Sequence, residues 1–348
     1  MKTAALVLLL GLGLGACAAT GAGGSGKLQA DVVFTRYTAL SRSVEIARRT
    51  LPPLTFARIE QKLLADKHKL NDQAIDLRNE KFSIYVPGAA PPPKGYGLLV
   101  WIPPWTGPTH PKIWRPPLDR FGLVFVAADN SGNDESILDR RLPLAILAAE
   151  NVRALYPIDP ERVYVGGLSG GSRVAEITAL AYPDVFRGAL LNAGSEPVDG
   201  AGGMYKPPAE LYQLFERTRL VYITGDQDES NLTQDQISQE SMHDWCVFDV
   251  KVEIALGLAH QTLDAPSMDR ALKALEEPRS VDSNDLASCN ARIQRELAVQ
   301  LRQAEAAISR GDRESARALL KSIDARYGGM AAPAIVELDV RLNALTSR

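Results

Sequence analysis

Strand-like and helix-like segments alternate over about 200 residues of this 348-residue chain, and this alternation limits the possible folds more than any other feature. The runs "YGLLVWI" and "FGLVFVA" are almost continuously apolar, as in strands that are buried on both faces of a parallel sheet. Segments with helical spacing, such as "LPLAILAAENVRAL", lie between such runs. The pattern predicts a doubly wound α/β domain over residues 81–280, with a mostly parallel central sheet and helices on both faces.

Segments with helical spacing of apolar residues flank this domain on both sides. The segments "SRSVEIARRT" and "FARIEQKLLADKHKL" place apolar residues three and four apart, and they predict a helical N-terminal extension over residues 31–80. Beyond the domain, "RIQRELAVQLRQAEAAISRGDRESARALLKSI" is amphipathic and broken at a glycine. It predicts a helical C-terminal extension over residues 281–348.

The first 17 residues have the pattern of a targeting segment. "MKTAALVLLLGLGLGAC" has a basic start and an apolar run too short for a stable transmembrane helix, which predicts a signal peptide over residues 1–16. Its end, "LGAC", resembles the lipobox of bacterial lipoproteins, which implies a lipid on Cys17 and a place on the bacterial cell envelope, at the outer membrane. A plain signal peptide cut nearby is the alternative. Small and polar residues over 17–30 predict a flexible tether.

Charge and ligand patterns restrict the partners of the chain. The formal net charge is −3 and no long run of Lys or Arg occurs, which argues against a nucleic-acid partner. No H-E-x-x-H motif and no Cys/His ligand set is present, so we expect neither a catalytic metal nor a cofactor.

Cysteine usage suggests one disulfide. With Cys17 lipidated, Cys246 and Cys289 remain as a pair in an oxidising compartment. A bond between them is one reading of this count, and two buried free thiols are the other.

The stretch "RVYVGGLSGGSRVAEIT" contains a serine at a sharp bend. Ser169 lies within G-x-S-x-G, preceded by a strand-like run and followed by helical spacing, which is the context of a nucleophile elbow. Gly167 and Gly171 permit a close approach of strand and helix. The helix that begins after Ser169 offers free N–H groups and a positive dipole end. The alternative is a structural turn with a capping serine.

On these residues the chain resembles the α/β-hydrolase superfamily over about residues 81–278. Within it, the chain is most similar to secreted bacterial esterases of the polyhydroxybutyrate-depolymerase and feruloyl-esterase kind. The resemblance implies an α/β-hydrolase fold and a catalytic triad in the chain order Ser, acid, His.

That order selects the base among four histidines. His68 and His110 precede Ser169 and fail the test, and His243 lies inside a predicted helix. His260 follows the strand-like "DVKVEIAL" in a loop, where the superfamily places its base. His260 is therefore the predicted base, with His243 as the alternative.

The acid is expected after the strand-like "RLVYITG". Asp226, Asp228 and Glu229 follow it, and the superfamily pattern strand-G-x-x-D selects Asp228. Asp226 is the runner-up, and a solvated acidic loop that caps the next helix is the non-catalytic interpretation.

The oxyanion hole is where the chain departs from the family. Pro103 and Pro104 follow the first central strand, where family members often carry H-G-G-G or H-G-x, and prolines have no N–H to donate. Alignment with H-G-x assigns one donor to the N–H of Trp105. The second donor is the N–H of Gly170.

The predicted chemistry is hydrolysis of a carboxylic ester, in a small molecule or a polymer, by a serine hydrolase with a Ser169–His260–Asp228 triad and an acyl-enzyme. A serine peptidase on the same fold is one alternative. A catalytically weak envelope binding protein is another, favoured by the two prolines.

Overall fold

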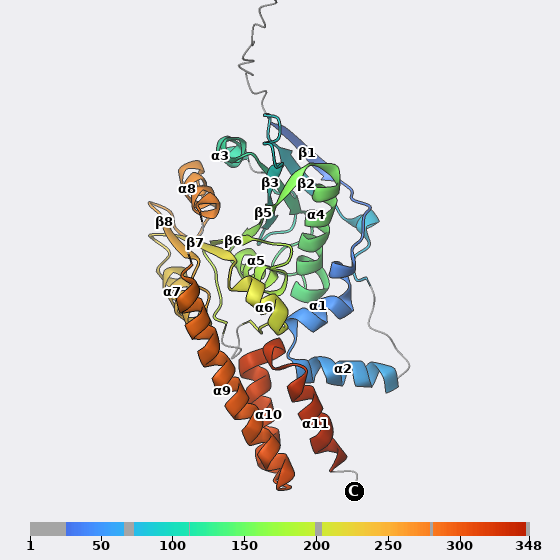
Figure 1. The fold of residues 1–348 in the computed structure, drawn as a ribbon. Coiled ribbons are helices and arrows are strands. Elements are labelled where there is room, and N and C mark those ends of the chain that lie inside the picture. Colours follow the sequence, from blue (N-terminus) through green and yellow to red (C-terminus); the bar gives the residue numbers. More distant parts are fainter. Residues whose placement is uncertain (1–25, 66–72, 111, 199–203, 279–280, 346–348) are drawn as a thin grey trace, which may run out of the picture.

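A computed structural model describes residues 26–65, 73–110, 112–198, 204–278 and 281–345 (Figure 1). The predicted signal peptide over 1–16, Cys17 and His68 lie outside the described residues. Lipidation, envelope localisation and membrane attachment therefore stay predictions.

Eight strands form one sheet in the order β1-β2-β4-β3-β5-β6-β7-β8. The strands are β1 (Lys27–Val32), β2 (Phe82–Val86), β3 (Tyr96–Ile102), β4 (Leu123–Ala128), β5 (Ile158–Leu168), β6 (Gly188–Asn192), β7 (Arg219–Gly225) and β8 (Val250–Ala255). The pairs β1–β2 and β2–β4 are antiparallel, and all other neighbours are parallel. The prediction of a mostly parallel α/β-hydrolase sheet is confirmed.

Eleven α-helices connect or flank these strands within the described residues. They are α1 (Ser43–Thr50), α2 (Pro53–Ala65), α3 (Arg115–Phe121), α4 (Leu142–Leu155), α5 (Gly170–Ala181), α6 (Ala209–Phe215), α7 (Glu229–Asp244), α8 (Ala265–Glu276), α9 (Ser283–Ser309), α10 (Arg313–Tyr327) and α11 (Ala334–Ala344). Short helical segments are η1 (Ala39–Ser41), η2 (Leu77–Asn79), η3 (Lys112–Trp114), the π-helix η4 (Ile137–Arg141) and η5 (Gly328–Ala331).

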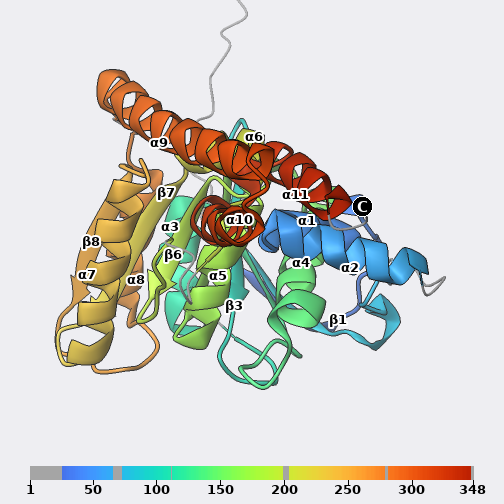
Figure 2. The ribbon, with the colours of Figure 1, turned by 90° about the horizontal axis from the view of Figure 1, so that it is seen from below.

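Helices cover both faces of the sheet, as Figure 2 shows. Strand β3 is buried along its whole length, and its side chains alternate between two apolar clusters. Val100 and Ile102 belong to the cluster beneath α4 and α5, whereas Leu99 and Trp101 belong to the cluster beneath α3 and α8. Two buried faces explain why the central strands read as continuous apolar runs.

The N-terminal boundaries differ from the predicted ones. Residues 27–30, which were predicted as part of the tether, belong instead to β1 (Lys27–Val32), the outer strand of the same sheet. Helices α1 and α2, within the predicted helical extension, place Ile46 and Leu54 in the main core. An edge strand is held by backbone pairing with one neighbour and needs no apolar run, so β1 gave no sequence signal.

The C-terminal region is helical, as predicted. Helix α10 packs along α9, and α11 contacts both α9 and α2. Figure 1 shows these helices together at one end of the molecule, below α6 and α1. None of the described helices, including the 27-residue α9, is long and apolar enough to cross a membrane.

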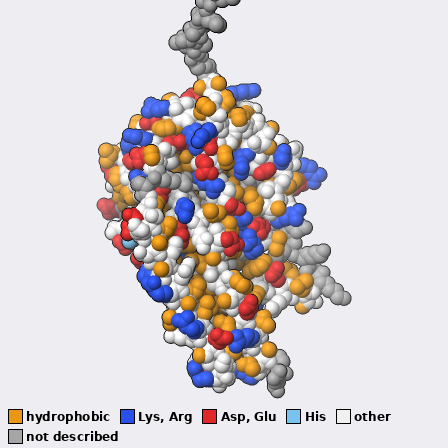
Figure 3. All heavy atoms as spheres, in the orientation of Figure 1, with side chains coloured by type: hydrophobic (Ala, Val, Ile, Leu, Met, Phe, Trp, Pro, Cys, Tyr) orange, Lys and Arg blue, Asp and Glu red, His pale blue; other side chains and the backbone are white. Residues whose placement is uncertain are grey.

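Charged side chains of both signs are interspersed over the face seen in Figure 3. Apolar atoms gather more densely towards the C-terminal helices on this face. Mixed charge of this kind is typical of a surface without a strong single-sign field.

A disulfide fastens the C-terminal helices to the α/β domain. Cys246, in the turn after α7, is bonded to Cys289 on α9, with the two Cα atoms 5.7 Å apart. The structure thus contains the bond that the cysteine count suggested.

Replacing both Cys246 and Cys289 by alanine is expected to lower the free energy of unfolding by about 4 kcal/mol, because the bond closes a long loop in the unfolded chain. Urea unfolding measures the change, and reduction of the wild-type protein should shift the midpoint equally. An unaltered midpoint in the double variant would contradict the prediction.

Candidate active site

Ser169 occupies a strained turn between β5 and α5. Its backbone has φ of 56° and ψ of −123°, a conformation that costs a non-glycine residue about 1–3 kcal/mol. The turn lets β5 end at Leu168 and α5 begin at Gly170 without an intervening loop. The side chain is half-buried, and its hydroxyl lies at the positive end of α5.

The glycines that flank the turn are required by close contacts. A Cβ atom at Gly167 would overlap the backbone of Gly171, and one at Gly171 would overlap the carbonyl oxygen of Ile102 at the end of β3. The start of α5 therefore lies directly against the loop that follows β3.

Gly171→Ala is expected to displace that loop or the start of α5, because the methyl group has no space beside Ile102. A reaction at Ser169 should slow by about 100-fold, the effect that a displacement of about 1 Å can have in a reacting site. Steady-state kinetics and thermal unfolding measure the two consequences. A variant with wild-type kcat and stability would show that the backbone at Ile102 can move aside without cost.

Ser169, His260 and Asp228 form a hydrogen-bonded series. His260 Nε2 lies 2.8 Å from Ser169 Oγ, and His260 Nδ1 lies 2.7 Å from Asp228 Oδ2. Parallel strands bring the three together, since β5, β7 and β8 all end at the same edge of the sheet. The contact to the carboxylate assigns the ring proton to Nδ1, so that Nε2 accepts the hydrogen bond of the serine hydroxyl.

Asn231 was missed by the sequence analysis, although it supports the acid. Its side-chain amide donates to Asp228 Oδ1 at 3.0 Å and to Oδ2 at 2.9 Å. Arg173 on α5 in turn donates to Asn231 Oδ1 at 3.3 Å. The only sequence signal was the spacing of an N-capping aspartate and a residue three positions later at the start of α7.

The surroundings keep Asp228 ionised. Burial acts to raise the pKa of this carboxyl, but hydrogen bonds from Asn231 and His260 outweigh it, so the pKa lies below its ordinary value. A carboxylate in this place can orient the imidazole of His260 and stabilise its protonated form.

The alternative candidates lie elsewhere or make other contacts. His243 is near the far end of α7, about 20 Å along the helix axis from Asp228. Asp226 accepts a hydrogen bond from the N–H of Gly257 at 2.8 Å.

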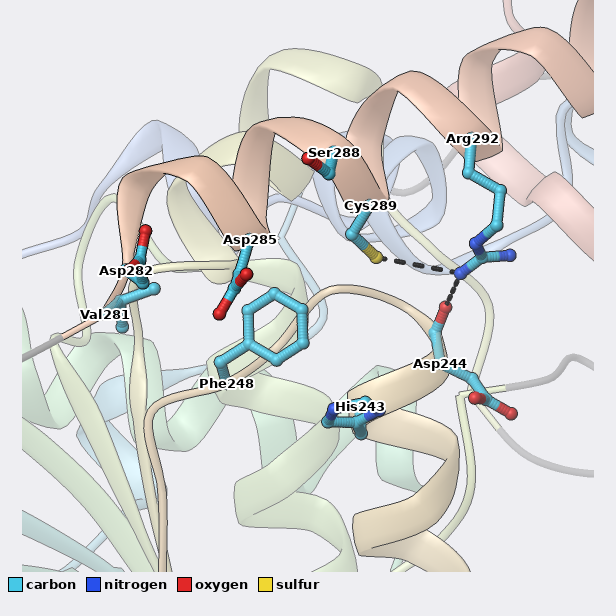
Figure 4. A pocket seen from close by; sticks show the side chains of 9 residues that line it. All are labelled: His243, Asp244, Phe248, Val281, Asp282, Asp285, Ser288, Cys289 and Arg292. Atoms are coloured by element: carbon cyan, nitrogen blue, oxygen red, sulfur yellow. Dashed lines mark hydrogen bonds between the residues drawn. The ribbon is translucent and has the colours of Figure 1, made fainter.

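His243 lines a cavity of about 710 Å³ between the end of α7 and the start of α9 (Figure 4). Figure 4 shows His243 beside Phe248, and the rings are 5.1 Å apart in an edge arrangement. Arg292 reaches across to the carbonyl oxygen of Asp244. Among the residues that the structure describes, no group of three or more His, Cys, Asp or Glu side chains is placed to hold a metal ion.

The two predicted oxyanion donors belong to segments that meet. The loop after β3, which contains Trp105, contacts the start of α5, which contains Gly170. The N–H of Asn133 donates to the carbonyl of Pro104 at 3.0 Å, and the Asn133 side chain lies against Gly170. Trp105 is 38% exposed.

Comparison with known proteins finds short sequence similarities. No family model matches the chain. Poly(3-hydroxyalkanoate) depolymerase C of Paucimonas lemoignei is 42% identical over 66 residues, which cover 19% of this chain and 14% of the relative. Poly(3-hydroxybutyrate) depolymerase of Ralstonia pickettii is 32% identical over 98 residues, 24% of this chain and 20% of the relative. The chain thus spans a fifth or less of the curated relatives that it matches.

Solved structures match a longer part of the chain at low identity. The match to Est1E from Butyrivibrio proteoclasticus covers 58% of this chain and 95% of the Est1E chain, with 16% identity and a TM-score of 0.39. The match to a ferulic acid esterase covers 56% of this chain and 88% of the esterase chain, with 13% identity and a TM-score of 0.41. By its own sheet order and strand directions, this chain has the α/β-hydrolase fold, and part of its sequence is similar to poly(3-hydroxyalkanoate) depolymerases.

Proposed function

We propose that this chain is a serine hydrolase that cleaves a carboxylic ester through an acyl-enzyme on Ser169. The observation that carries the proposal is the hydrogen-bonded series from Asp228 through His260 to Ser169, with the serine on a strained turn. A serine hydroxyl needs a base to attack a carbonyl carbon, and the base needs an orienting carboxylate. All three groups are within hydrogen-bond distance in their required order.

Each step of the reaction has a residue to perform it. His260 Nε2 takes the Ser169 proton as Oγ bonds to the ester carbon, and the carbonyl oxygen becomes an oxyanion held by the N–H groups of Gly170 and Trp105. Collapse of this intermediate breaks the ester bond, and His260 returns the proton to the leaving alcohol. A water molecule then attacks the acyl-enzyme with His260 as base, and the acid product leaves with Ser169 restored.

The substrate class follows from two supports. The local similarity to poly(3-hydroxyalkanoate) depolymerases favours esters of hydroxy acids, as oligomers or polymer. Exposed apolar side chains on the loops beside the triad, Trp105 at 38% and Leu256 at 72%, suit an apolar ester chain lying across an open site.

A substrate panel tests the proposal. We expect turnover of p-nitrophenyl esters and of 3-hydroxybutyrate oligomers, no turnover of aminoacyl p-nitroanilides, and labelling of Ser169 by a fluorophosphonate. Faster cleavage of the amides would instead identify a peptidase. A folded protein with neither turnover nor labelling would identify a binding protein and overturn the proposal.

A further inference from the structure

Arg141 is a buried cation beside the candidate active site. It ends the π-helix η4 just before α4, and it is only 3% exposed. In the part of the chain that the structure describes, no carboxylate forms an ion pair with it. Its guanidinium donates instead to two backbone carbonyls, from Nε to Ser131 at 2.9 Å and from Nη2 to Pro103 at 3.2 Å. A charge this deeply buried is tolerated only where such hydrogen bonds hold it.

These two carbonyls belong to the two loops that border the nucleophile. Pro103 lies in the loop after β3, and Ser131 lies in the loop after β4. The guanidinium is rigid and planar, so it fixes the distance and direction between the loops better than a flexible ammonium would. Since Pro103 and Pro104 have no N–H groups, the backbone at these two positions can be anchored only through its carbonyls, whereas further along the loop the N–H of Gly107 donates to the carbonyl of Asp129 at 2.6 Å.

The anchoring sets the direction of the Trp105 N–H. In a trans peptide the C=O and N–H groups point in opposite directions. The Pro104 carbonyl is bound by the N–H of Asn133 at 3.0 Å, which orients the peptide that carries the Trp105 N–H. Arg141 orients the preceding peptide through Pro103, and through Ser131 it also holds the loop that contains Asn133.

The same loops touch the other donor. The Asn133 side chain lies so close to Gly170 that a Cβ atom there would overlap Asn133 Oδ1. A shift of the loop after β4 is therefore transmitted to both Trp105 and Gly170, the two donors of the oxyanion hole.

We propose that Arg141 is a positioning residue of the oxyanion hole: by tying Pro103 to Ser131, it holds the Trp105 N–H in place to receive the oxyanion that forms on attack by Ser169. This inference rests on the proposed esterase function. Arg141 touches neither substrate nor the reacting atoms, and it acts through the backbone of the two loops.

The test compares Arg141→Met and Arg141→Lys with the wild-type protein on a p-nitrophenyl ester. We expect Arg141→Met to lower kcat by about 10- to 100-fold, because a small displacement of a donor costs that much. KM should change less than about threefold, since the ground-state ester gains little from the oxyanion hole. Binding of a trifluoromethyl ketone, which forms an oxyanion on the serine, should weaken in proportion to kcat/KM. Arg141→Lys should recover part of the loss.

Arg162→Met is the matched control. Arg162 also donates to a backbone carbonyl, that of Phe121 at 2.7 Å, but it lies in the middle of β5 and pairs with Glu276. The variant Arg162→Met should lower the free energy of unfolding and leave kcat unchanged. Arg141→Lys, which keeps the charge and most of the volume, decides the question if Arg141→Met does not fold.

The two possible failures are distinguishable. Active wild-type protein whose folded Arg141 variants keep their kcat and their affinity for the ketone would overturn the assignment of Arg141 alone. Wild-type protein without ester turnover and without fluorophosphonate labelling would overturn the proposed function, and the assignment with it.

Discussion

Ser169→Ala is expected to lower kcat for ester hydrolysis by about a million-fold, the effect of removing the nucleophile from a triad that works as a unit. The variant keeps the backbone turn but has no side-chain hydroxyl to attack the ester carbon. A p-nitrophenyl ester assay with stopped-flow and long-time readings covers this range. Fluorophosphonate labelling should be lost at the same time, while the far-UV spectrum and the thermal midpoint remain close to wild type.

Ser172→Ala is the matched control for this variant. Ser172 lies one turn further along α5, is fully buried, and donates to the carbonyl of Gly194. Its loss should cost about 1 kcal/mol of stability and leave labelling intact. Retention of more than about a thousandth of wild-type turnover by Ser169→Ala would mean that another group attacks the ester.

The second large effect is a fall in stability with rising pH, caused by Glu176 on α5. This side chain is fully buried, and burial raises its pKa to about 8. Hydrogen bonds from the N–H of Glu196 and the hydroxyls of Ser238 and Tyr222 act in the opposite direction without cancelling the effect of burial.

The sign follows from proton linkage. A carboxyl group whose pKa is raised in the folded state holds its proton more tightly there than in the unfolded chain. Its stabilising effect is complete below the unfolded pKa of 4.5 and is lost as the pH rises through about 8. The free energy of unfolding should therefore fall by about 1.4 kcal/mol per pH unit between these values, a loss of about 5 kcal/mol.

Glu176→Gln removes this titration and should flatten the dependence. Urea unfolding at several pH values between 5 and 8 measures it. Asp235, whose pKa burial also raises, contributes a slope of the same sign that remains in Glu176→Gln. Glu240→Gln, on the exposed side of α7, makes the same chemical change in contact with water and should keep the wild-type slope. Parallel curves for Glu176→Gln and the wild type would refute the assignment to Glu176.

Sequence patterns were sufficient where the deciding contacts are local. The elbow at Ser169 is defined by its immediate neighbours, since Gly167 and Gly171 must be small for β5 and α5 to meet. Burial on both faces made the central strands visible as apolar runs. The pairing of Asp228 with His260 came from the chain order of a superfamily, and the parallel strand ends explain why that order brings the residues together.

Sequence patterns did not identify residues that act through partners far away along the chain. Arg141 reaches Pro103 across 38 positions, and nothing in its own neighbourhood distinguishes it from the exposed arginines of other helices. Glu176 is in contact with Tyr222 on β7 and Ser238 on α7, which lie 46 and 62 positions away along the chain. The edge strand β1 lacks an apolar run, because one paired edge supplies its hydrogen bonds.

The class of fold, the turn that exposes Ser169 and the candidates for base and acid could be predicted before folding was known, because periodicity and glycine spacing are properties of short segments and the order of the triad is a property of the superfamily. The support that Asn231 and Arg141 give to the site, and the extent to which the C-terminal helices join the core, became visible in the folded structure alone. Those outcomes depend on side chains from separate elements packing at one edge of a sheet, where small shifts of backbone decide which atoms touch.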